Sequence, residues 1–184
     1  MSKKIIGDVD LTNLYFKRLP DILKDITVSG HFGCDYNNLT SLEGAPKTVG
    51  GNYSCNYNKL TSLEGVPTNV DGDFYCNGNK LTSLQGAPTN VGGDFNCSNN
   101  LLTSLTGAPK TVGNSFICNS NKLTSLIGAP TSVGVSFYCG NNNLTSLVGA
   151  PKTVGGHFYC NDNPVKFTRE QVRAVCNVKG NIYV

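Results

Sequence analysis

The hydrophobic and polar positions of the chain repeat with a period of 21 residues over most of its length. In the clearest copy, residues 70–90, large apolar residues stand at Val70, Phe74, Leu81 and Leu84. A cysteine recurs in the same position of successive copies, at Cys34, Cys55, Cys76, Cys97, Cys118, Cys139 and Cys160. An asparagine follows each cysteine three residues later, at Asn37, Asn58, Asn79, Asn100, Asn121, Asn142 and Asn163. A constant period of this length indicates a solenoid, in which each repeat is one coil stacked on its neighbours.

Each repeat divides into three zones. Residues 73–77 alternate polar and apolar, which predicts a short parallel strand with Phe74 and Cys76 pointing inward. The residues around Asn79 then turn the chain away from the strand. Residues 84–88 contain Gly and Pro and lack a helical period, so we expect loop, polyproline or 3₁₀ structure there. The predicted fold class is therefore α+β or mostly β: a solenoid with one short strand per repeat and an irregular back face.

The two ends depart from the period and are expected to cap a single domain, residues 1–184. Residues 1–27 are interpreted as a divergent first repeat, as is usual for the terminal unit of a repeat array. Residues 28–163 hold six full repeats and a partial seventh. Residues 164–184 change character and predict a cap made of a helix and a strand.

The helix of this C-terminal cap has a clear start signal. Thr168 and Gln171 have the spacing of a capping box, in which each side chain bonds the backbone amide of the other residue. We expect the helix to run to about Cys176. Residues 180–184 then resemble the strand of the repeats, so the chain is predicted to finish as one more strand.

The repeat resembles the leucine-rich repeat. Residues 74–81 supply L-x-L-x-x-N-x-L, with Phe and Cys in two of the leucine positions, and residues 84–88 are similar to the back segment of short bacterial repeats. The chain looks most like the short repeat proteins, of about 21 residues per unit, found in bacterial and bacteriophage genomes. This resemblance implies a leucine-rich-repeat-like stack that recognises another protein through its strand face.

The chain departs from the family pattern just before each strand. Val70 lies four residues before Phe74, one residue more than the family spacing. Each repeat therefore carries an extra residue, usually within a Gly-Gly pair. The extra residue predicts a bulge or kink ahead of the strand.

Charge and composition narrow the range of partners. The formal net charge is +3, and the repeats themselves are near neutral, so no basic stripe predicts a nucleic-acid groove. No apolar run approaches the ~18 residues of a membrane span, and residues 1–8 lack the apolar core of a signal peptide. We expect a cytoplasmic protein with reduced thiols, and neither a nucleic-acid nor a membrane partner.

The cysteine and asparagine columns are interpreted as structural. Metal sites need paired cysteines or clustered histidines, whereas here one cysteine occurs per repeat. Stacked strands bring neighbouring cysteines within disulfide range, but the odd number and parallel Cβ directions disfavour full pairing. Buried thiols acting as small apolar fillers are the preferred interpretation. Each inward asparagine is expected to bond backbone groups of its own and the adjacent coil. No metal or cofactor is expected.

No catalytic constellation is evident in the sequence. His31 and His157 stand at opposite ends of the array, and the Gly-Gly pairs precede strands, whereas a phosphate loop precedes a helix. An enzymatic alternative uses Asp73 and Asp94, which fall on adjacent strands at about the ~5 Å spacing of a retaining glycosidase pair. Nothing in the surrounding sequence would raise the pKa of either carboxyl. The sequence therefore predicts no enzyme.

The position most informative about function is the outward one between Phe and Cys in each repeat. The residue at this position varies between copies, whereas the core positions stay nearly constant. Exposed tyrosines are enriched at protein interfaces. The predicted protein-binding residues are Tyr75, Ile117, Tyr138 and Tyr159, with Asp73, Asp94 and His157 as polar companions. Alternatively, Tyr and Ile occur there only because both favour β-strands.

Two functional hypotheses follow. The first is a non-enzymatic protein-binding module, which the bacteriophage resemblance extends to a modulator of a host protein, for example a defence protein. The second is a structural or self-associating protein, a homodimer formed through the C-terminal edge strand around Ile182 and Tyr183.

Overall fold

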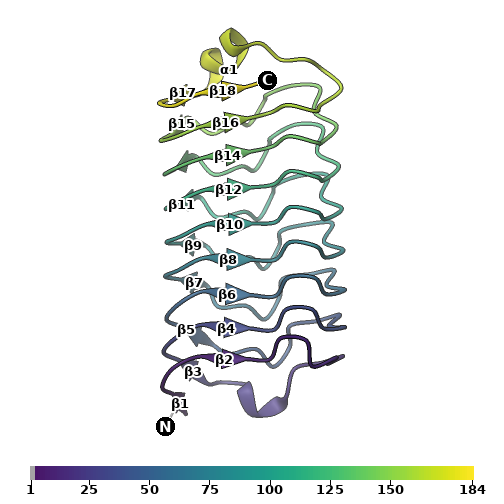
Figure 1. Ribbon diagram of the computed structural model, residues 1–184, viewed down its shortest axis with the longest axis vertical. Coiled ribbons are helices and arrows are strands. Elements are labelled where there is room, and N and C mark those ends of the chain that lie inside the picture. Colours follow the sequence, from purple (N-terminus) through teal and green to yellow (C-terminus); the bar gives the residue numbers. More distant parts are fainter. Residues whose placement is uncertain (1–2) are drawn as a thin grey trace.

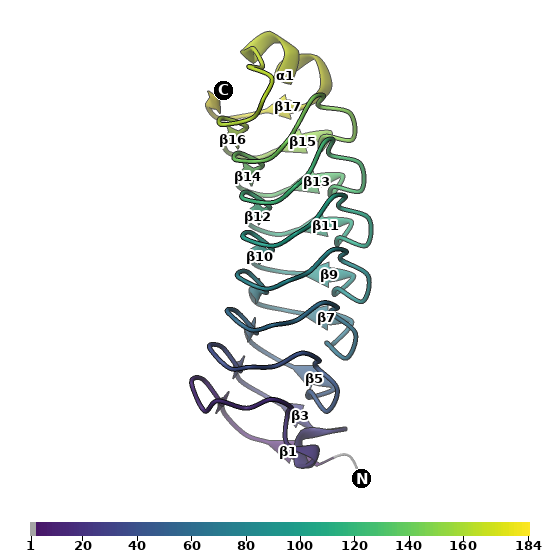
Figure 2. The same ribbon diagram turned by 90° about the vertical axis from the view of Figure 1, so that its right-hand side faces the viewer.

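Each 21-residue repeat forms one coil of a parallel β-solenoid, and the coils stack along a single axis (Figure 1). The computed structural model describes residues 3–184. Figure 2 shows the same stack from the side, with the N-terminus at one end and the C-terminal helix at the other. The predicted fold class is confirmed: a repeat solenoid whose one α-helix among residues 3–184 lies near the C-terminus.

The strands form two nine-stranded parallel sheets. The first sheet contains β1 (Lys4–Ile5), β3 (Thr27–Val28), β5 (Thr48–Val49), β7 (Asn69–Val70), β9 (Asn90–Val91), β11 (Thr111–Val112), β13 (Ser132–Val133), β15 (Thr153–Val154) and β17 (Asn177–Val178). The second sheet contains β2 (Val9–Asp10), β4 (Phe32–Gly33), β6 (Tyr53–Ser54), β8 (Phe74–Tyr75), β10 (Phe95–Asn96), β12 (Phe116–Ile117), β14 (Phe137–Tyr138), β16 (Phe158–Tyr159) and β18 (Ile182–Tyr183). Equivalent residues of neighbouring coils pair in register, as Phe95 does with Phe74 and Phe116.

The structure has two strands per coil where the sequence predicts one: β8 lies within the predicted zone of residues 73–77, and β7 precedes that zone. A bend at residues 71–72 separates β7 from β8, at the place of the extra residue that predicts a kink. Glycine is required in these bends because the coils approach closely there. A Cβ on Gly134 would overlap the carbonyl oxygen of Gly113. The sequence prediction of a single strand missed the first sheet because Val70 alone marks it as apolar.

The core is a set of columns of identical side chains. Phe74 and Cys76 are fully buried, as predicted, together with Leu81 and Leu84. The phenylalanine rings stack along the axis, with centroids 5.3 Å apart between Phe95 and the next ring in the column. Because every coil places the same residue over its neighbour, the apolar surface of one coil is buried by the next.

The asparagine column confirms the predicted structural role. The Asn79 side-chain amide donates to the carbonyl oxygens of Cys76 in its own coil, at 3.1 Å, and Cys55 in the preceding coil, at 3.0 Å. Its oxygen accepts the N–H of Leu60 at 3.0 Å. One buried side chain therefore joins two coils and satisfies the backbone groups at the turn, which would otherwise be buried without partners.

The cysteine column consists of free, buried thiols, as expected for apolar fillers. Five of the Sγ–H groups donate to carbonyl oxygens of the next coil, for example from Cys118 to Tyr138 at 3.2 Å. Burial raises the pKa of these thiols, which at Cys160 reaches about 11. The thiols therefore stay protonated and unreactive near neutral pH.

The ends of the solenoid differ from each other. The first coil contains a 3₁₀ helix, η1 (Asp21–Leu23), and the last contains α1 (Arg169–Val175). The predicted capping box is present: Thr168 accepts the N–H of Gln171, and Gln171 accepts the N–H of Thr168. Val172 of α1 is fully buried against the last coil, so this helix covers the C-terminal end of the core.

The asparagine column should dominate the stability of the solenoid. We predict that Asn79→Ala lowers the free energy of unfolding by about 2–3 kcal/mol, because it leaves the buried N–H of Leu60 without a partner. Urea denaturation followed by circular dichroism measures this change. The control Asn90→Ala, at an exposed position, should cost less than about 0.5 kcal/mol. Equal effects of the two substitutions would contradict the stabilising role of the asparagine column.

One position of the phenylalanine column holds a tyrosine. Tyr53 is fully buried, and its hydroxyl makes no hydrogen bond among the residues that the structure describes. Tyr53→Phe should therefore stabilise the protein by about 1 kcal/mol and raise its Tm by roughly 2–4 °C. The reverse change, Phe74→Tyr, should destabilise it. Differential scanning calorimetry tests both, and a lower Tm for Tyr53→Phe would show that the hydroxyl has a partner.

Candidate functional site

The outward face of the second sheet carries the predicted binding residues. Because the strands pair in register, outward residues at one position of the repeat form a column along the axis. Ile117, Tyr138, Tyr159 and Tyr183 occupy consecutive strands of one column and pair directly with one another. Tyr75 belongs to the same column but is separated from Ile117 by Asn96.

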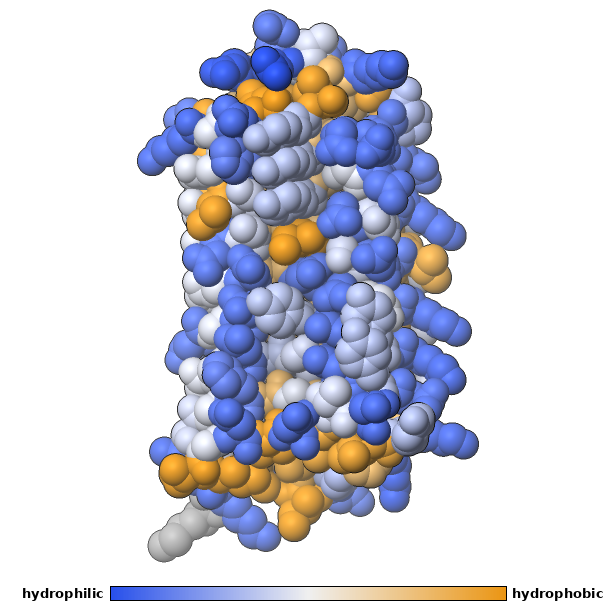
Figure 3. All heavy atoms as spheres, in the orientation of Figure 1, coloured by the Kyte–Doolittle hydropathy of each residue, from blue (hydrophilic) through white to orange (hydrophobic). Residues whose placement is uncertain are grey.

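Three tyrosines of this column form a stack. The ring centroids of Tyr138 and Tyr159 lie 4.4 Å apart at an interplanar angle of 8°, and those of Tyr159 and Tyr183 lie 4.4 Å apart at 4°. Figure 3 views this face, and aromatic rings form a pale column in its upper half. We call Tyr138, Tyr159 and Tyr183 the tyrosine stack. The central ring, Tyr159, packs against both of its neighbours and restricts their rotation, so the stack is a preorganised surface.

Tyr183 was not among the predicted site residues. It lies in β18, after the α1 insertion has interrupted the constant period. The signal that identifies it is local: Gly180–Val184 resembles the strand segment of the repeats, and in-register pairing then places Tyr183 beside Tyr159.

His157 lies against the tyrosine stack. Its ring is edge-on to Tyr159, with centroids 6.1 Å apart, and to Tyr183, at 5.9 Å. Its Nδ1 accepts the backbone N–H of Asn181 at 2.9 Å. His157 therefore both holds the last coil in place and flanks the exposed rings.

The predicted polar companions have a structural contact that the sequence did not indicate. The Oδ1 atom of Asp73 accepts the backbone N–H of Asp94 at 2.7 Å, and that of Asp94 accepts the N–H of Ser115 at 2.8 Å. Asn52 bonds the N–H of Asp73 in the same way, at 2.9 Å. Side chains at this position thus link successive coils just before each strand of the second sheet.

Tyr75 has a different environment from the tyrosine stack. Its neighbours in register are Ser54 and Asn96, so no ring packs on it from the adjacent strands. Its hydroxyl donates to Oδ2 of Asp73 at 2.9 Å. Partial burial, the bond to Asp73 and the nearby charges of Asp73 and Asp94 raise the pKa of Tyr75 to about 12.

A second pair of stacked tyrosines lies where the chain turns after the strands. The rings of Tyr36 and Tyr57 are 4.6 Å apart at 11°, and both residues have positive φ, near 50°. Near the tyrosine stack, the lining of a surface groove of about 320 Å³ includes Tyr138, Tyr159, Asn141 and Asp162. The groove is a depression in this face beside the tyrosine stack.

The chemistry of this face is that of a polar surface with aromatic anchors. Residues 3–184 contain no group of three or more His, Cys, Asp or Glu side chains arranged to hold a metal ion. In that same range, no helix has the length and hydropathy to cross a membrane.

Comparison with known proteins identifies no relative. None of the protein-family models matches the chain. A search of curated proteins also gives no significant sequence match. The repeat solenoid itself is therefore established by the structure alone.

The pKa of Tyr75 can be tested by titration. We predict ionisation near pH 12, against ~10 for a free tyrosine. Because the folded pKa is raised, the resulting stabilisation is complete below pH ~10 and is lost as the pH rises toward 12. Asp73→Asn should lower the pKa of Tyr75, since it removes the neighbouring negative charge. Absorbance at 295 nm, with Tyr75→Phe as the reference, measures the pKa of Tyr75. An unchanged titration in Asp73→Asn would contradict the contact between Tyr75 and Asp73.

Proposed function

We propose that the chain is a non-enzymatic binding protein that recognises another protein through the outward face of its second sheet. The observation that carries this proposal is the tyrosine stack next to Ile117 on an otherwise polar face. Tyrosine combines a large apolar area with a hydroxyl that tolerates water, and for this reason it is enriched among residues that dominate interface energies.

The rigidity of the stack supports the same proposal. Binding normally costs free energy because side chains lose rotamer freedom at the interface. Tyr138 and Tyr159 have already lost much of that freedom to ring stacking at 4.4 Å. A partner that contacts them meets a smaller entropic cost than it would on isolated tyrosines.

The face is large enough for a specific interface. Nine strands at a spacing of ~4.8 Å extend over roughly 38 Å. A standard protein interface needs about 800 Å² on each partner. The tyrosine stack would then be the centre of a contact area that also covers the groove beside it.

The resemblance to short bacterial and bacteriophage repeat proteins suggests the kind of partner. On that resemblance, the proposed partner is a protein of the cell in which the chain is made, such as a defence protein, and the site of action is the cytoplasm. This part of the proposal rests on the repeat pattern of residues 28–163.

A homodimer remains the second candidate, because both sheets have open edges. At the C-terminal end these edges are β17 and β18, and Tyr183 of β18 is 40% exposed. An edge strand presents unpaired backbone groups that a second copy could pair with. The two candidates differ in the oligomeric state expected of the isolated protein.

Substitution of tyrosines in the stack should weaken partner binding without unfolding the protein. We predict that Tyr138→Ser with Tyr159→Ser lowers affinity for the protein partner by at least ~10-fold, because two anchors of a hot spot are removed. The partner is first isolated from the native cell by affinity purification, and its affinity is then measured by calorimetry. The matched control, Tyr36→Ser with Tyr57→Ser, removes a similar stacked pair elsewhere. Undiminished affinity in the Tyr138/Tyr159 variant would reject the proposed face.

Sedimentation analysis distinguishes the second candidate. We predict a monomer at micromolar concentration. A dimer that dissociates on Tyr183→Lys would instead support self-association through β18, since a charge at an edge strand opposes pairing.

A further inference from the structure

The outward face of the second sheet contains a hollow in its N-terminal half. The column that holds Tyr75 and Tyr138 has Gly33 in β4 and Ser54 in β6, so two neighbouring coils lack a large side chain there. In the same column, Asp10 of β2 pairs with Gly33. The hollow has a volume of about 440 Å³, and all four residues from Asp10 to Tyr75 in this column line it. A gap between a carboxylate and an aromatic ring is thus part of the face.

The carboxylates that line this hollow have no cationic partner. They belong to Asp8, Asp10 and Asp35. Oδ1 of Asp35 accepts the N–H of Asn56 at 2.6 Å, and the Ser54 hydroxyl lies 2.6 Å from Oδ1 and 2.7 Å from Oδ2. A single hydroxyl hydrogen cannot serve both oxygens, so Asp35 keeps an open acceptor position. Among residues 3–184, no lysine or arginine forms an ion pair with any of the three carboxylates.

The uncompensated negative charge has an effect on Asp35. This residue is half-buried, and its burial raises the pKa of the carboxyl above the usual value. The charge of Asp10 raises the same pKa, whereas the hydrogen bonds from Ser54 and Asn56 lower it. A positive charge in the hollow would offset both the burial and the charge of Asp10, because an opposite charge nearby favours the ionised carboxylate.

An aromatic ring forms another wall of the hollow. Tyr75 pairs in register with Ser54 and Asn96, so neither adjacent strand covers its ring with a second ring. The Tyr75 hydroxyl donates to Asp73 at 2.9 Å, which holds the ring beside the hollow. The face of an aromatic ring attracts cations, and an arginine guanidinium also stacks on it because both groups are planar.

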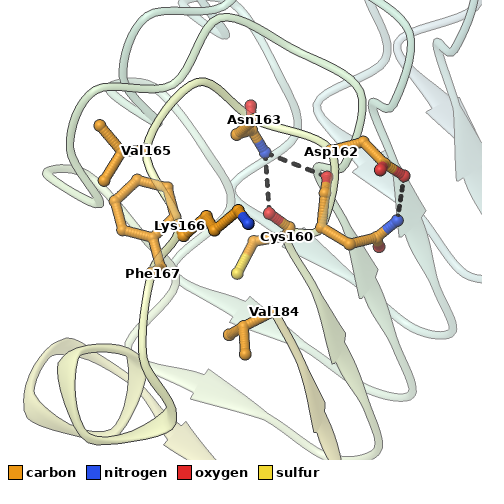
Figure 4. A pocket seen from close by; sticks show the side chains of 8 residues that line it. Cys160, Asp162, Asn163, Val165, Lys166, Phe167 and Val184 are labelled. Carbon is orange, nitrogen blue, oxygen red and sulfur yellow. Dashed lines mark hydrogen bonds between the residues drawn. The ribbon is translucent and has the colours of Figure 1, made fainter.

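Charge distinguishes this part of the molecule from the rest. The formal net charge of the chain is +3, but five aspartates and no lysine or arginine occur in and beside β2, β4, β6, β8 and β10, within residues 8–12, 31–35, 52–56, 73–77 and 94–98. A larger hollow of about 490 Å³ near Cys160 is lined by one side chain of each charge, Asp162 and Lys166 (Figure 4). The hollow at Gly33 therefore favours a cationic ligand, whereas the charges beside Cys160 balance.

We propose that the hollow at Gly33 binds the guanidinium group of an arginine in the partner protein. The guanidinium donates to Asp10 and Asp35 and lies against the ring of Tyr75. This inference rests on the proposed function, because it adds a charged contact to the same outward face. From β4 to β14 there are five strand spacings, roughly 24 Å at ~4.8 Å each, so one partner can contact both this hollow and Tyr138.

The walls of the hollow select arginine over similar groups. Arginine carries its N–H donors in a planar fork and is weakly hydrated, so it can stack on a ring and bond carboxylates at the same time. Lysine carries a compact, strongly hydrated charge that does not stack. Citrulline has nearly the shape of arginine but no charge, and its hydrogen bonds to carboxylates are therefore weaker.

A small arginine compound tests the hollow without the partner. N-acetyl-arginine methylamide is titrated into the ¹⁵N-labelled protein in low-salt buffer, because salt screens exposed charges. It should shift the amide resonances of Gly33, Ser54 and Tyr75. The citrulline analogue should bind at least ~10-fold more weakly, since its hydrogen bonds to the carboxylates lack the charge. The lysine analogue should bind at least ~3-fold more weakly. Equal binding of the three compounds, or shifts confined to other residues, would overturn the proposal.

Gly33→Tyr is a variant that fills the hollow and suits the fold. A Cβ at Gly33 meets no atom closer than 3.5 Å, and tyrosine already occupies the equivalent position in β8, β14 and β16. This variant should weaken binding of the arginine compound by ~10-fold or more, because the ring takes the place of the guanidinium. The control Ile117→Tyr, at the equivalent position of β12 outside the hollow, should leave binding within about twofold. The comparison of the three compounds on the parent protein stands even if a variant misfolds.

The arginine site and the tyrosine stack can be tested separately. Tyr138→Ser with Tyr159→Ser should leave binding of the arginine compound within about twofold, because neither residue lines the hollow. With the isolated partner, Gly33→Tyr should lower the affinity by ~10-fold or more. An unchanged partner affinity in Gly33→Tyr would reject the arginine contact, and the role of the tyrosine stack would be unaffected.

Discussion

The structure depends on one hydrogen-bonding arrangement, in which a buried asparagine is shared between two coils. Asn79 satisfies backbone groups of its own coil and of the preceding one, so neither coil is complete alone. A single repeat buries too few apolar side chains to offset the ordering of its backbone. Stacking supplies the missing burial, and the asparagine fixes the register in which the coils stack. The near identity of the repeats follows from this requirement.

The same in-register stacking determines which surface positions are free to vary. At the position of Asp73 and Asp94, the side chain bonds the next coil, so part of its chemistry is already used. At the position of Tyr138, the rings of neighbouring coils stack on one another. The backbone links between coils at this position, such as the bond from the Cys139 N–H to the Tyr159 oxygen, do not depend on the side chain, which makes it a suitable place for the proposed recognition.

The period of the sequence was sufficient to predict the solenoid, the inward Phe and Cys and the asparagine bonds, and the local spacing of Thr168 and Gln171 predicted the capping box. It did not predict the first sheet, because only Val70 marks that strand and the bend after it depends on close backbone approach at glycines such as Gly134. The acceptor role of Asp73 was missed since it requires the position of an amide 21 residues away. Tyr183 was missed because α1 displaces it from the period.

The proposed binding face lies where the outward residues of the coils differ while the contacts between coils stay the same. Inside the array, each cysteine carbonyl accepts two amides and each coil covers its neighbour. At Cys160 the carbonyl oxygen accepts one asparagine amide, that of Asn163, among the described residues. The tyrosine stack likewise reaches the edge strand β18, where no further strand covers Tyr183. If this face binds a partner as proposed, the recognition chemistry of a solenoid built from nearly identical contacts lies in the few outward positions that differ between coils.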